Sequence, residues 1–172
     1  ISMNTGKKSS SADNQQVSKK NVHDDYFSGF VDGEGCFYIG FSKRDDLPMK
    51  WQILTEFHVS QNPGGKNVLR TLQKRLGCGY LKPNHPKSSS DKTWILIIKD
   101  KDDLRNKVIP FFDAHPLQTT KRLDYQVFKK VIQVIAEKHH LTKEGFRRIV
   151  DLVFSLKRET KKRYTKEMLL SS

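Results

Sequence analysis

Apolar and polar positions follow two different periods along the first third of the chain. Over residues 24–32, Tyr26, Phe27, Phe30 and Val31 have the spacing of one helix face, which predicts a short helix. From residue 37 to residue 42 the period changes to two, which is typical of a strand. The sequence therefore predicts a bend at 33–35 that joins a helix to a strand.

A longer strand is predicted over residues 50–60, after the turn-rich segment 44–48. Its odd positions are largely apolar, and these are Trp51, Ile53, Thr55, Phe57 and Val59. Its even positions are mostly polar, and these are Gln52, Leu54, Glu56, His58 and Ser60. One face of this strand is expected to meet a core, and the other to meet water or a ligand.

The rest of the chain continues with helices and one more strand pair. Asn62 and Pro63 begin a predicted helix that Gly77 ends. Strands follow at 80–82 and 93–98, joined by the polar segment 83–92, and helices follow at 101–112, 120–138 and 142–156. The order α-β-β-α-β-β-α indicates an α+β fold, with an antiparallel four-stranded sheet and helices on one face.

The domain organisation follows from the same pattern. Residues 1–22 are Ser- and Lys-rich and are interpreted as a flexible N-terminal arm, residues 23–156 as a single domain, and residues 157–172 as a basic C-terminal tail.

No apolar run approaches the ~20 residues of a membrane span, so no membrane partner is expected. Cys36 and Cys78 belong to no metal-binding spacing and fit a reducing compartment. The expected location is intracellular, either an organelle (chloroplast or mitochondrion) or a bacterial or archaeal cytoplasm.

Charge narrows the class of partner. The chain has 32 Lys plus Arg against 19 Asp plus Glu, a formal net charge of +13. Such an excess favours a polyanion such as nucleic acid, because neutralised phosphates release condensed counterions. The alternative is ordinary solubilising charge.

The segment Phe27–Phe37, FSGFVDGEGCF, contains three glycines and two acids. Asp32-Gly33 alone would suit a two-residue hairpin turn, but the residues before it have helical rather than alternating spacing. A calcium loop is excluded, because the ladder of oxygen-bearing residues is missing. The segment is therefore interpreted as a helix end that presents a carboxylate.

FSGFVDGEGCF resembles the signature of the LAGLIDADG homing endonucleases. The segments 57–61 (FHVSQ), 76–80 (LGCGY), 110–112 (PFF) and 119–129 (TTKRLDYQVFK) are also similar to this family in order and spacing, so the resemblance covers about residues 22–156. It implies a site-specific, divalent-metal-dependent DNA endonuclease of the intron-encoded kind. Alternatives are an RNA-binding maturase that acts on intron RNA, and a DNA-binding module without catalysis.

The resemblance also implies an assembly. Gly29 and Gly33 lie four residues apart, where the absence of side chains lets two helix backbones approach closely. The chain carries one such motif, so the second helix is expected from a second copy, in a homodimer on a pseudo-palindromic duplex DNA. The residues expected at the interface are Ser28, Gly29, Asp32 and Gly33.

For catalysis, the resemblance implies a Mg2+ site, with Mn2+ as a substitute. Glu34 matches the metal-binding carboxylate of the family, and the Gly33 carbonyl is the expected auxiliary ligand. Gln61 would organise water at the site, with helix capping as its alternative role. Lys121 would be the basic residue near the scissile phosphate, with Arg122 as the alternative in a shifted register. Asp32 is expected to be structural.

DNA recognition is assigned to the polar side of the sheet, called here the reading face, because two antiparallel strands fit the major groove. Its expected residues are Tyr38, Gly40, Ser42, Arg44, Gln52, Glu56, His58, Ser60, Tyr80, Lys82, Asn84, Thr93 and Ile95. Lys66 is expected to add a positive charge near the DNA. The alternative for each of these residues is a solvated surface.

Overall fold

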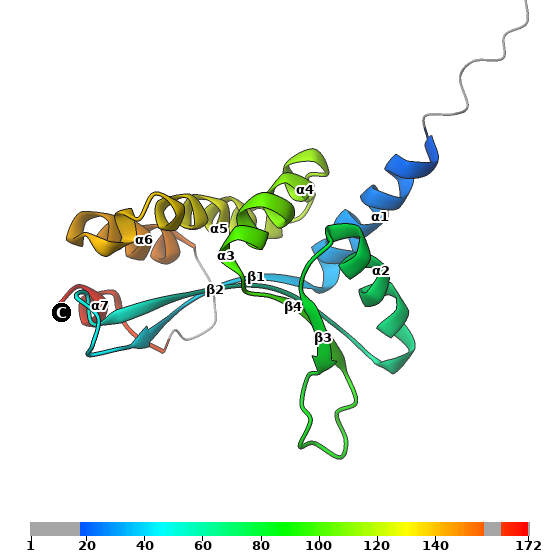
Figure 1. The fold of residues 1–172 in the computed structure, drawn as a ribbon, viewed down its shortest axis with the longest axis horizontal. Coiled ribbons are helices and arrows are strands. Elements are labelled where there is room, and N and C mark those ends of the chain that lie inside the picture. The colour runs from blue at the N-terminus through cyan, green and yellow to red at the C-terminus, as the bar shows by residue number, and fades with distance from the viewer. Residues whose placement is uncertain (1–17, 157–162, 172) are drawn as a thin grey trace, which may run out of the picture.

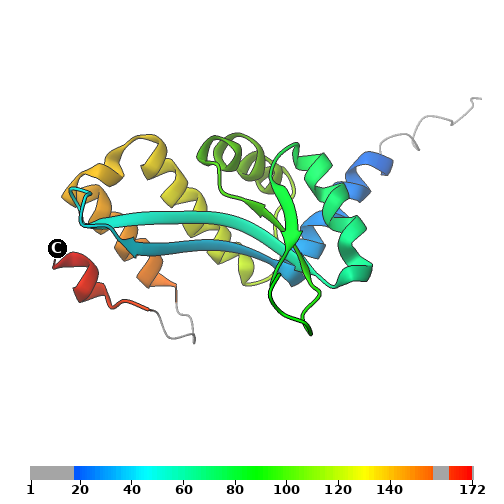
Figure 2. The same ribbon diagram turned by 60° about the horizontal axis from the view of Figure 1, so that its bottom comes forward.

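The computed structural model describes residues 18–156 and 163–171. Strands β1 (Gly35–Lys43), β2 (Trp51–Gln61), β3 (Tyr80–Pro83) and β4 (Trp94–Ile98) form one antiparallel sheet in the order β1-β2-β4-β3. The long β1–β2 hairpin runs across the molecule, and the shorter β3–β4 pair lies at one end of it (Figure 2). The predicted α+β fold with a four-stranded antiparallel sheet is confirmed.

The helices are α1 (Ser18–Glu34), α2 (Lys66–Leu76), α3 (Lys101–Asp103), α4 (Ile109–Ala114), α5 (Lys121–Ala136), α6 (Lys143–Ser155) and α7 (Lys166–Leu170). Short 3-10 turns at Pro63–Gly65 and His139–Leu141 precede α2 and α6. In Figure 1, α3 to α6 lie along one side of the sheet, α1 and α2 lie at the end that carries β3, and the β3–β4 loop extends away on the other side. Within the described residues, no helix is long and apolar enough to cross a bilayer.

The period-two pattern of β2 correctly predicts its two faces. Trp51, Ile53, Thr55, Phe57 and Val59 are buried, whereas the even positions between them are exposed or half-buried. The buried side packs against an aromatic cluster formed by Phe37, Phe57, Phe112, Tyr125 and Phe128, in which Phe37 contacts the other four rings at centroid distances of 5.2 to 5.5 Å. This cluster joins the sheet to α4 and α5.

The predicted ends of the helix after β2 are confirmed, and the structure adds a short 3-10 turn before α2. The side chain of Asn62 accepts a hydrogen bond from Gly65 N at 3.0 Å and so caps the 3-10 turn that leads into α2. Gly77 ends α2 with a φ of 67°, a left-handed conformation that favours glycine.

The first helix differs from the prediction at both ends. It begins at Ser18, inside the segment expected to be a flexible arm, and it continues through Glu34, so the acids lie in its last turn and no bend separates them. The chain passes directly into β1 at the buried Gly35, where a Cβ would lie 2.9 Å from Val31 O. Glycine is required here because the strand leaves the helix end at very close range. Residues 1–17, the remainder of the expected arm, lie outside the described residues.

The C-terminal residues also differ from the expected tail. Residues 163–171 pack onto the domain, since Leu169 in α7 is buried and Tyr164 contacts the Trp51 ring at 4.7 Å. Lys166 pairs with Asp151 of α6 at 2.8 Å. A basic segment with few apolar residues reads as a tail, yet two of those residues cover the far end of the sheet. Residues 157–162 lie outside the described residues.

The region predicted as a single helix over 101–112 consists of three consecutive pieces. α3 is followed by a π-helical stretch, Leu104–Val108, and then by α4. Pro110 lies near the start of α4, where its missing N–H removes an intrahelical hydrogen bond.

Candidate active site and nucleic-acid interface

The last turn of α1 brings together three of the predicted site groups. Glu34 and Gly33 are exposed at the end of the helix. Lys121, the first residue of α5, extends its ammonium to this point and donates to Gly35 O at 2.5 Å and Gly33 O at 3.5 Å. A carboxylate, a backbone carbonyl and a lysine therefore share one exposed site, although Lys121 is 87 residues away from Glu34 in sequence.

Asp32 lies on the inner side of the same turn and binds its own chain. Its carboxylate accepts hydrogen bonds from Gln118 N at 2.6 Å, Thr119 N at 3.2 Å and Thr119 Oγ1 at 2.8 Å. Burial raises the pKa of Asp32, but these hydrogen bonds and the charge of Lys121 outweigh it, so the pKa lies below its usual value. Asp32 thus fixes the segment that places Lys121, as its expected structural role requires, and its expected position at a dimer interface stays a prediction.

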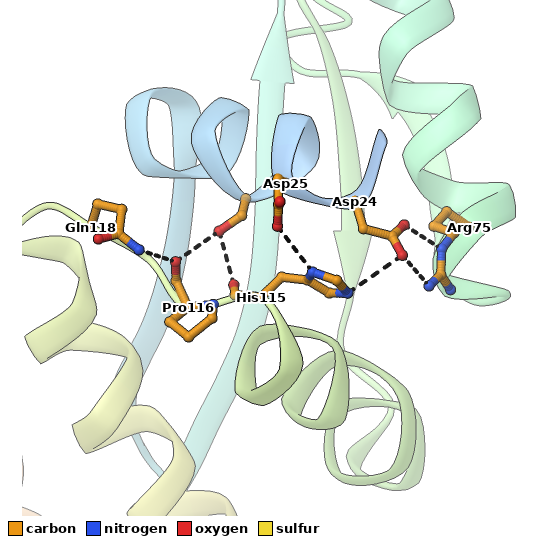
Figure 3. Close-up of polar contacts among 7 residues, drawn as sticks. Asp24, Asp25, Arg75, His115, Pro116 and Gln118 are labelled. Atoms are coloured by element: carbon orange, nitrogen blue, oxygen red, sulfur yellow. Dashed lines mark hydrogen bonds and ion pairs between the residues drawn. The ribbon is translucent and has the colours of Figure 1, made fainter. Parts of the chain in front are cut away.

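Ser28 also faces the interior of its own chain, which corrects its expected place at the interface. Its side chain is buried, and its hydroxyl donates to His115 O at 2.9 Å and Pro116 O at 3.2 Å. Figure 3 shows the helix held against the segment after α4 by these contacts. The hydroxyl supplies a donor to two carbonyls between helices, which a helix-face pattern does not reveal.

A second set of contacts holds the N-terminal half of α1 (Figure 3). The buried Asp24 carboxylate forms two hydrogen bonds of 2.6 Å with the guanidinium of Arg75 in α2. His115 lies between two acids, with Nε2 3.4 Å from Asp24 and Nδ1 3.2 Å from Asp25. These contacts of Asp24, Arg75 and His115 fix α1 relative to α2 and α4, and therefore fix the direction in which its last turn points.

The opposite side of α1 is open. Tyr26 is 54% exposed, Phe30 is half-buried, and their rings stack at 6.4 Å. Gly29 and Gly33 lie on the same exposed side, and among the described residues, apart from the adjacent residues and the backbone of the same helix, no heavy atom comes within 4 Å of a Cβ built on either one. This stripe of one Tyr, one Phe and two glycines has the composition of a close helix–helix contact.

Gln61 ends β2 beside this site. Val59, two residues earlier, pairs with Gly35, so the end of β2 reaches the junction of α1 and β1. A Cβ on Gly65 would lie 2.6 Å from Gln61 Oε1, so the glutamine side chain packs closely over the turn. Asn62 performs the capping that was the alternative role for Gln61.

The strand register places most of the expected reading-face residues on one side of the sheet. Tyr38 pairs with Glu56, Ser42 with Gln52, and Tyr80 with Ile97, which itself pairs with His58. Ser60 and Lys82 share this side through Ile95, with which both pair. Asn84 N donates to Thr93 O at 2.8 Å, which extends the β3–β4 pairing by one step.

Several of these residues are less accessible for contact with DNA than the sequence predicts. Ile95 is only 7% exposed and so forms part of the floor of the face. Gly40 is covered by the Tyr38 ring, because a Cβ there would overlap the hydroxyl end of that side chain. The Thr93 hydroxyl donates to Asp91 at 2.6 Å, and the Arg44 guanidinium makes two hydrogen bonds of 2.8 Å with Asp46.

Lys66 lies away from the reading face. Its ammonium is 3.0 Å from the centre of the Trp94 ring, and Trp94 packs against the core on the helix side of the sheet. Burial, followed by the charge of Arg70, lowers the pKa of Lys66. The structure thus places Lys66 on the helix side of the sheet, and its expected role as a positive charge near the DNA stays a prediction.

One cation on the reading face is missing from the sequence-based set. Lys99 follows β4 and its ammonium lies 2.8 Å from Glu56 Oε2. The alternation of Ile95 and Ile97 on the reading face, continued by one more step, would have found it. The neighbouring His58 approaches the other carboxylate oxygen of Glu56 at 2.8 Å.

The oxygen donors at the end of α1 suit a hard divalent cation such as Mg2+. Glu34 would supply a carboxylate and Gly33 a carbonyl. Across residues 18–156 and 163–171, no cluster of three His, Cys, Asp or Glu side chains is placed to hold a metal ion. One chain therefore fits such an ion as part of a site that other oxygen atoms complete.

Comparison with known proteins assigns the family. The LAGLIDADG endonuclease family model matches residues 27–132. A protein encoded in ND4 intron 1 of Podospora anserina is 34% identical over 120 residues, which is 69% of this chain and 25% of that protein. A probable intron-encoded endonuclease of Schizosaccharomyces pombe, Cox1-I1b, is 35% identical over 109 residues, which is 63% of this chain and 27% of that protein. The chain thus spans about a quarter of the length of these relatives.

Solved structures give the same result. The homing endonuclease I-TnaI superposes with a TM-score of 0.71 at 36% identity, covering 80% of this chain and 89% of that one. I-LtrWI, a LAGLIDADG homing endonuclease bound to its target DNA, superposes with a TM-score of 0.76 at 27% identity, covering 83% of this chain and 47% of that one. Because the family match spans more than half of the sequence and includes the helix end that carries Glu34, this chain belongs to the LAGLIDADG endonuclease family.

Proposed function

We propose that this chain is a site-specific DNA endonuclease domain that hydrolyses phosphodiester bonds in a long, pseudo-palindromic duplex target. The observation that carries the proposal is the meeting of Glu34, the Gly33 carbonyl and Lys121 at one end of a polar sheet face. The names of the relatives support it, since several are intron-encoded endonucleases. The net charge of +13 supports a polyanionic substrate.

In this proposal the residues have separate roles. Glu34 and the Gly33 carbonyl hold Mg2+, for which Mn2+ can substitute. When bound, such an ion stabilises charge on the phosphoryl oxygens and lowers the pKa of a coordinated water. Lys121 places a positive charge beside the scissile phosphate, where it stabilises the charge that develops in the transition state. Gln61 hydrogen-bonds and orients water at the edge of the site.

We propose that the active form is a homodimer that pairs the exposed stripes of two α1 helices. The stripe consists of Tyr26, Gly29, Phe30 and Gly33, whereas Ser28 is buried inside each protomer and the carboxylate of Asp32 binds its own chain. A two-fold axis through this contact would place two copies of Glu34 close together and direct the two reading faces to opposite half-sites. This arrangement gives one carboxylate for each DNA strand.

The test is cleavage of the intron-insertion duplex with Mg2+, comparing the unmodified protein with Glu34→Gln. The proposal expects both strands to be cut by the unmodified protein, and expects the variant to bind the duplex without cutting. Asp45→Asn, a change in the exposed β1–β2 turn, is the matched control and should cut normally. Binding of intron RNA with no DNA cleavage would favour the maturase alternative, and DNA binding without cleavage would favour a non-catalytic module.

A further inference from the structure

We propose that Glu56 and Lys99 act together as a reading pair for one C·G base pair in each DNA half-site. The inference rests on the proposed function, because it concerns the sequence that the reading face selects. It assigns a specificity role to Lys99, which lies just beyond the end of β4.

The strand register brings Glu56 and Lys99 together. Glu56 on β2 pairs with Tyr38 on β1, and its Oε2 atom is 2.8 Å from the Lys99 ammonium. These three side chains form a row across the sheet, on the side that carries Gln52 and Ser42. The Glu56 side chain is 18% exposed and that of Lys99 is 55% exposed, so the carboxylate is half-buried against the sheet and the ammonium is exposed to solvent.

The two side chains keep free hydrogen-bonding capacity. A lysine ammonium has three donors, and the contact with Glu56 uses one of them. The two oxygens of Glu56 face Lys99 and His58, and each retains a second lone pair. The hydrogen bond from Lys99 to Glu56 raises the pKa of the amine, against a smaller opposite effect of burial, so the amine stays charged.

This combination matches the major-groove edge of a C·G pair. Guanine offers two acceptors, N7 and O6, to the two remaining donors of Lys99, and the N4 amine of cytosine donates to Glu56. An A·T pair also carries two acceptors and one donor, but the N6 amine of adenine lies between N7 of adenine and O4 of thymine, so the two remaining donors of Lys99 would not meet two adjacent acceptors. Two adjacent acceptors with the donor at one end therefore favour guanine opposite cytosine.

Base contact also explains why the reading face carries an acidic residue. DNA phosphates repel a carboxylate on the surface that they approach, unless the carboxylate accepts a hydrogen bond from the DNA, and the surrounding cations only offset that repulsion. An ion pair whose amine is exposed to solvent contributes little to folding. A base amine satisfies Glu56 in the complex, and Lys99 holds the acid in position before DNA arrives.

The test is selection from a pool of duplex DNA with a randomised central region, bound by the unmodified protein, Glu56→Gln and Lys99→Met. The unmodified protein should enrich one C·G pair at a fixed position in each half-site. Both variants should relax the preference at that same position by on the order of tenfold to a hundredfold, and leave the other positions unchanged. Lys101→Met removes an equal charge from α3 on the helix side and should leave the base preference intact.

Two further variants sharpen the result. Lys99→Arg keeps donors for guanine and should retain the preference, which distinguishes base reading from loss of fold. Glu56→Lys combined with Lys99→Glu exchanges donor and acceptor and should reverse the strand that carries guanine. Relaxation at different positions for the two single variants, or an unchanged orientation in the exchanged variant, would overturn the reading pair. A pool in which the unmodified protein enriches no sequence would instead overturn the proposed function.

Discussion

Removal of the Asp32 carboxylate should weaken folding in a way that depends on pH. Asp32→Ala deletes an acceptor of three hydrogen bonds that join the last turn of α1 to the segment before α5. Hydrogen bonds to a charged group contribute about 1.5–3 kcal/mol each. Gln118 and Thr119 are exposed, so water replaces part of what they lose. We therefore expect Asp32→Ala to lower the unfolding free energy by about 1–2 kcal/mol at pH 7, which is less than the sum of the three hydrogen bonds.

The pH dependence follows from the direction of the shift. The pKa of Asp32 is lower in the folded protein than in the unfolded chain, where it is near 3.9. Its stabilising contribution is therefore complete above about pH 5 and is lost as the pH falls through the folded-state pKa. The difference in unfolding free energy between the unmodified protein and Asp32→Ala should shrink steadily below about pH 4.

Urea unfolding at pH 7 and at pH 3 measures this difference. Asp45→Ala serves as the control, because this side chain is 75% exposed and should change stability by less than about 0.5 kcal/mol. A cost that is the same at both pH values would refute the role of the ionised carboxylate. A cost near zero at pH 7 would refute the hydrogen-bonded link itself.

Four other changes have defined outcomes. Phe37→Ala removes the centre of the aromatic cluster and should lower the unfolding free energy by about 3–5 kcal/mol in urea; a loss below 1 kcal/mol would mean that the cluster repacks. Ser28→Ala should cost about 1–3 kcal/mol in the same assay, because two inward carbonyls lose their donor, and no change would show that water replaces it. Gly29→Leu combined with Gly33→Leu should abolish the dimer in light scattering without unfolding the protomer, and an intact dimer would exclude the α1 stripe as the contact. DNA affinity should fall steeply with salt, with a log–log slope of about −0.9 for each phosphate neutralised, and a flat dependence would contradict binding along the basic surface.

The α1 segment shows how far sequence patterns reach in this protein. Helical spacing and the glycine-acid motif correctly predicted a helix that presents Glu34, because both are properties of nearby residues. The same motif assigned four residues to one interface, but Ser28 and Asp32 bind carbonyl and amide groups at 115–119. Nothing in the local pattern distinguishes the inner side of the helix from the outer one, because that depends on what packs against it.

Sequence alone determined the elements with local causes. The alternation over 51–59 set the two faces of β2, Asn62 and Gly77 set the ends of the next helical region, and the period change after Gly35 located the helix–strand junction. Each rests on backbone geometry within a few residues. Only the tertiary structure decided that Lys121 reaches the carbonyls of Gly33 and Gly35, that Lys99 meets Glu56, and that Leu169 closes the far end of the core. These contacts join residues far apart in the chain, and strand register and helix packing, rather than local preference, bring them together.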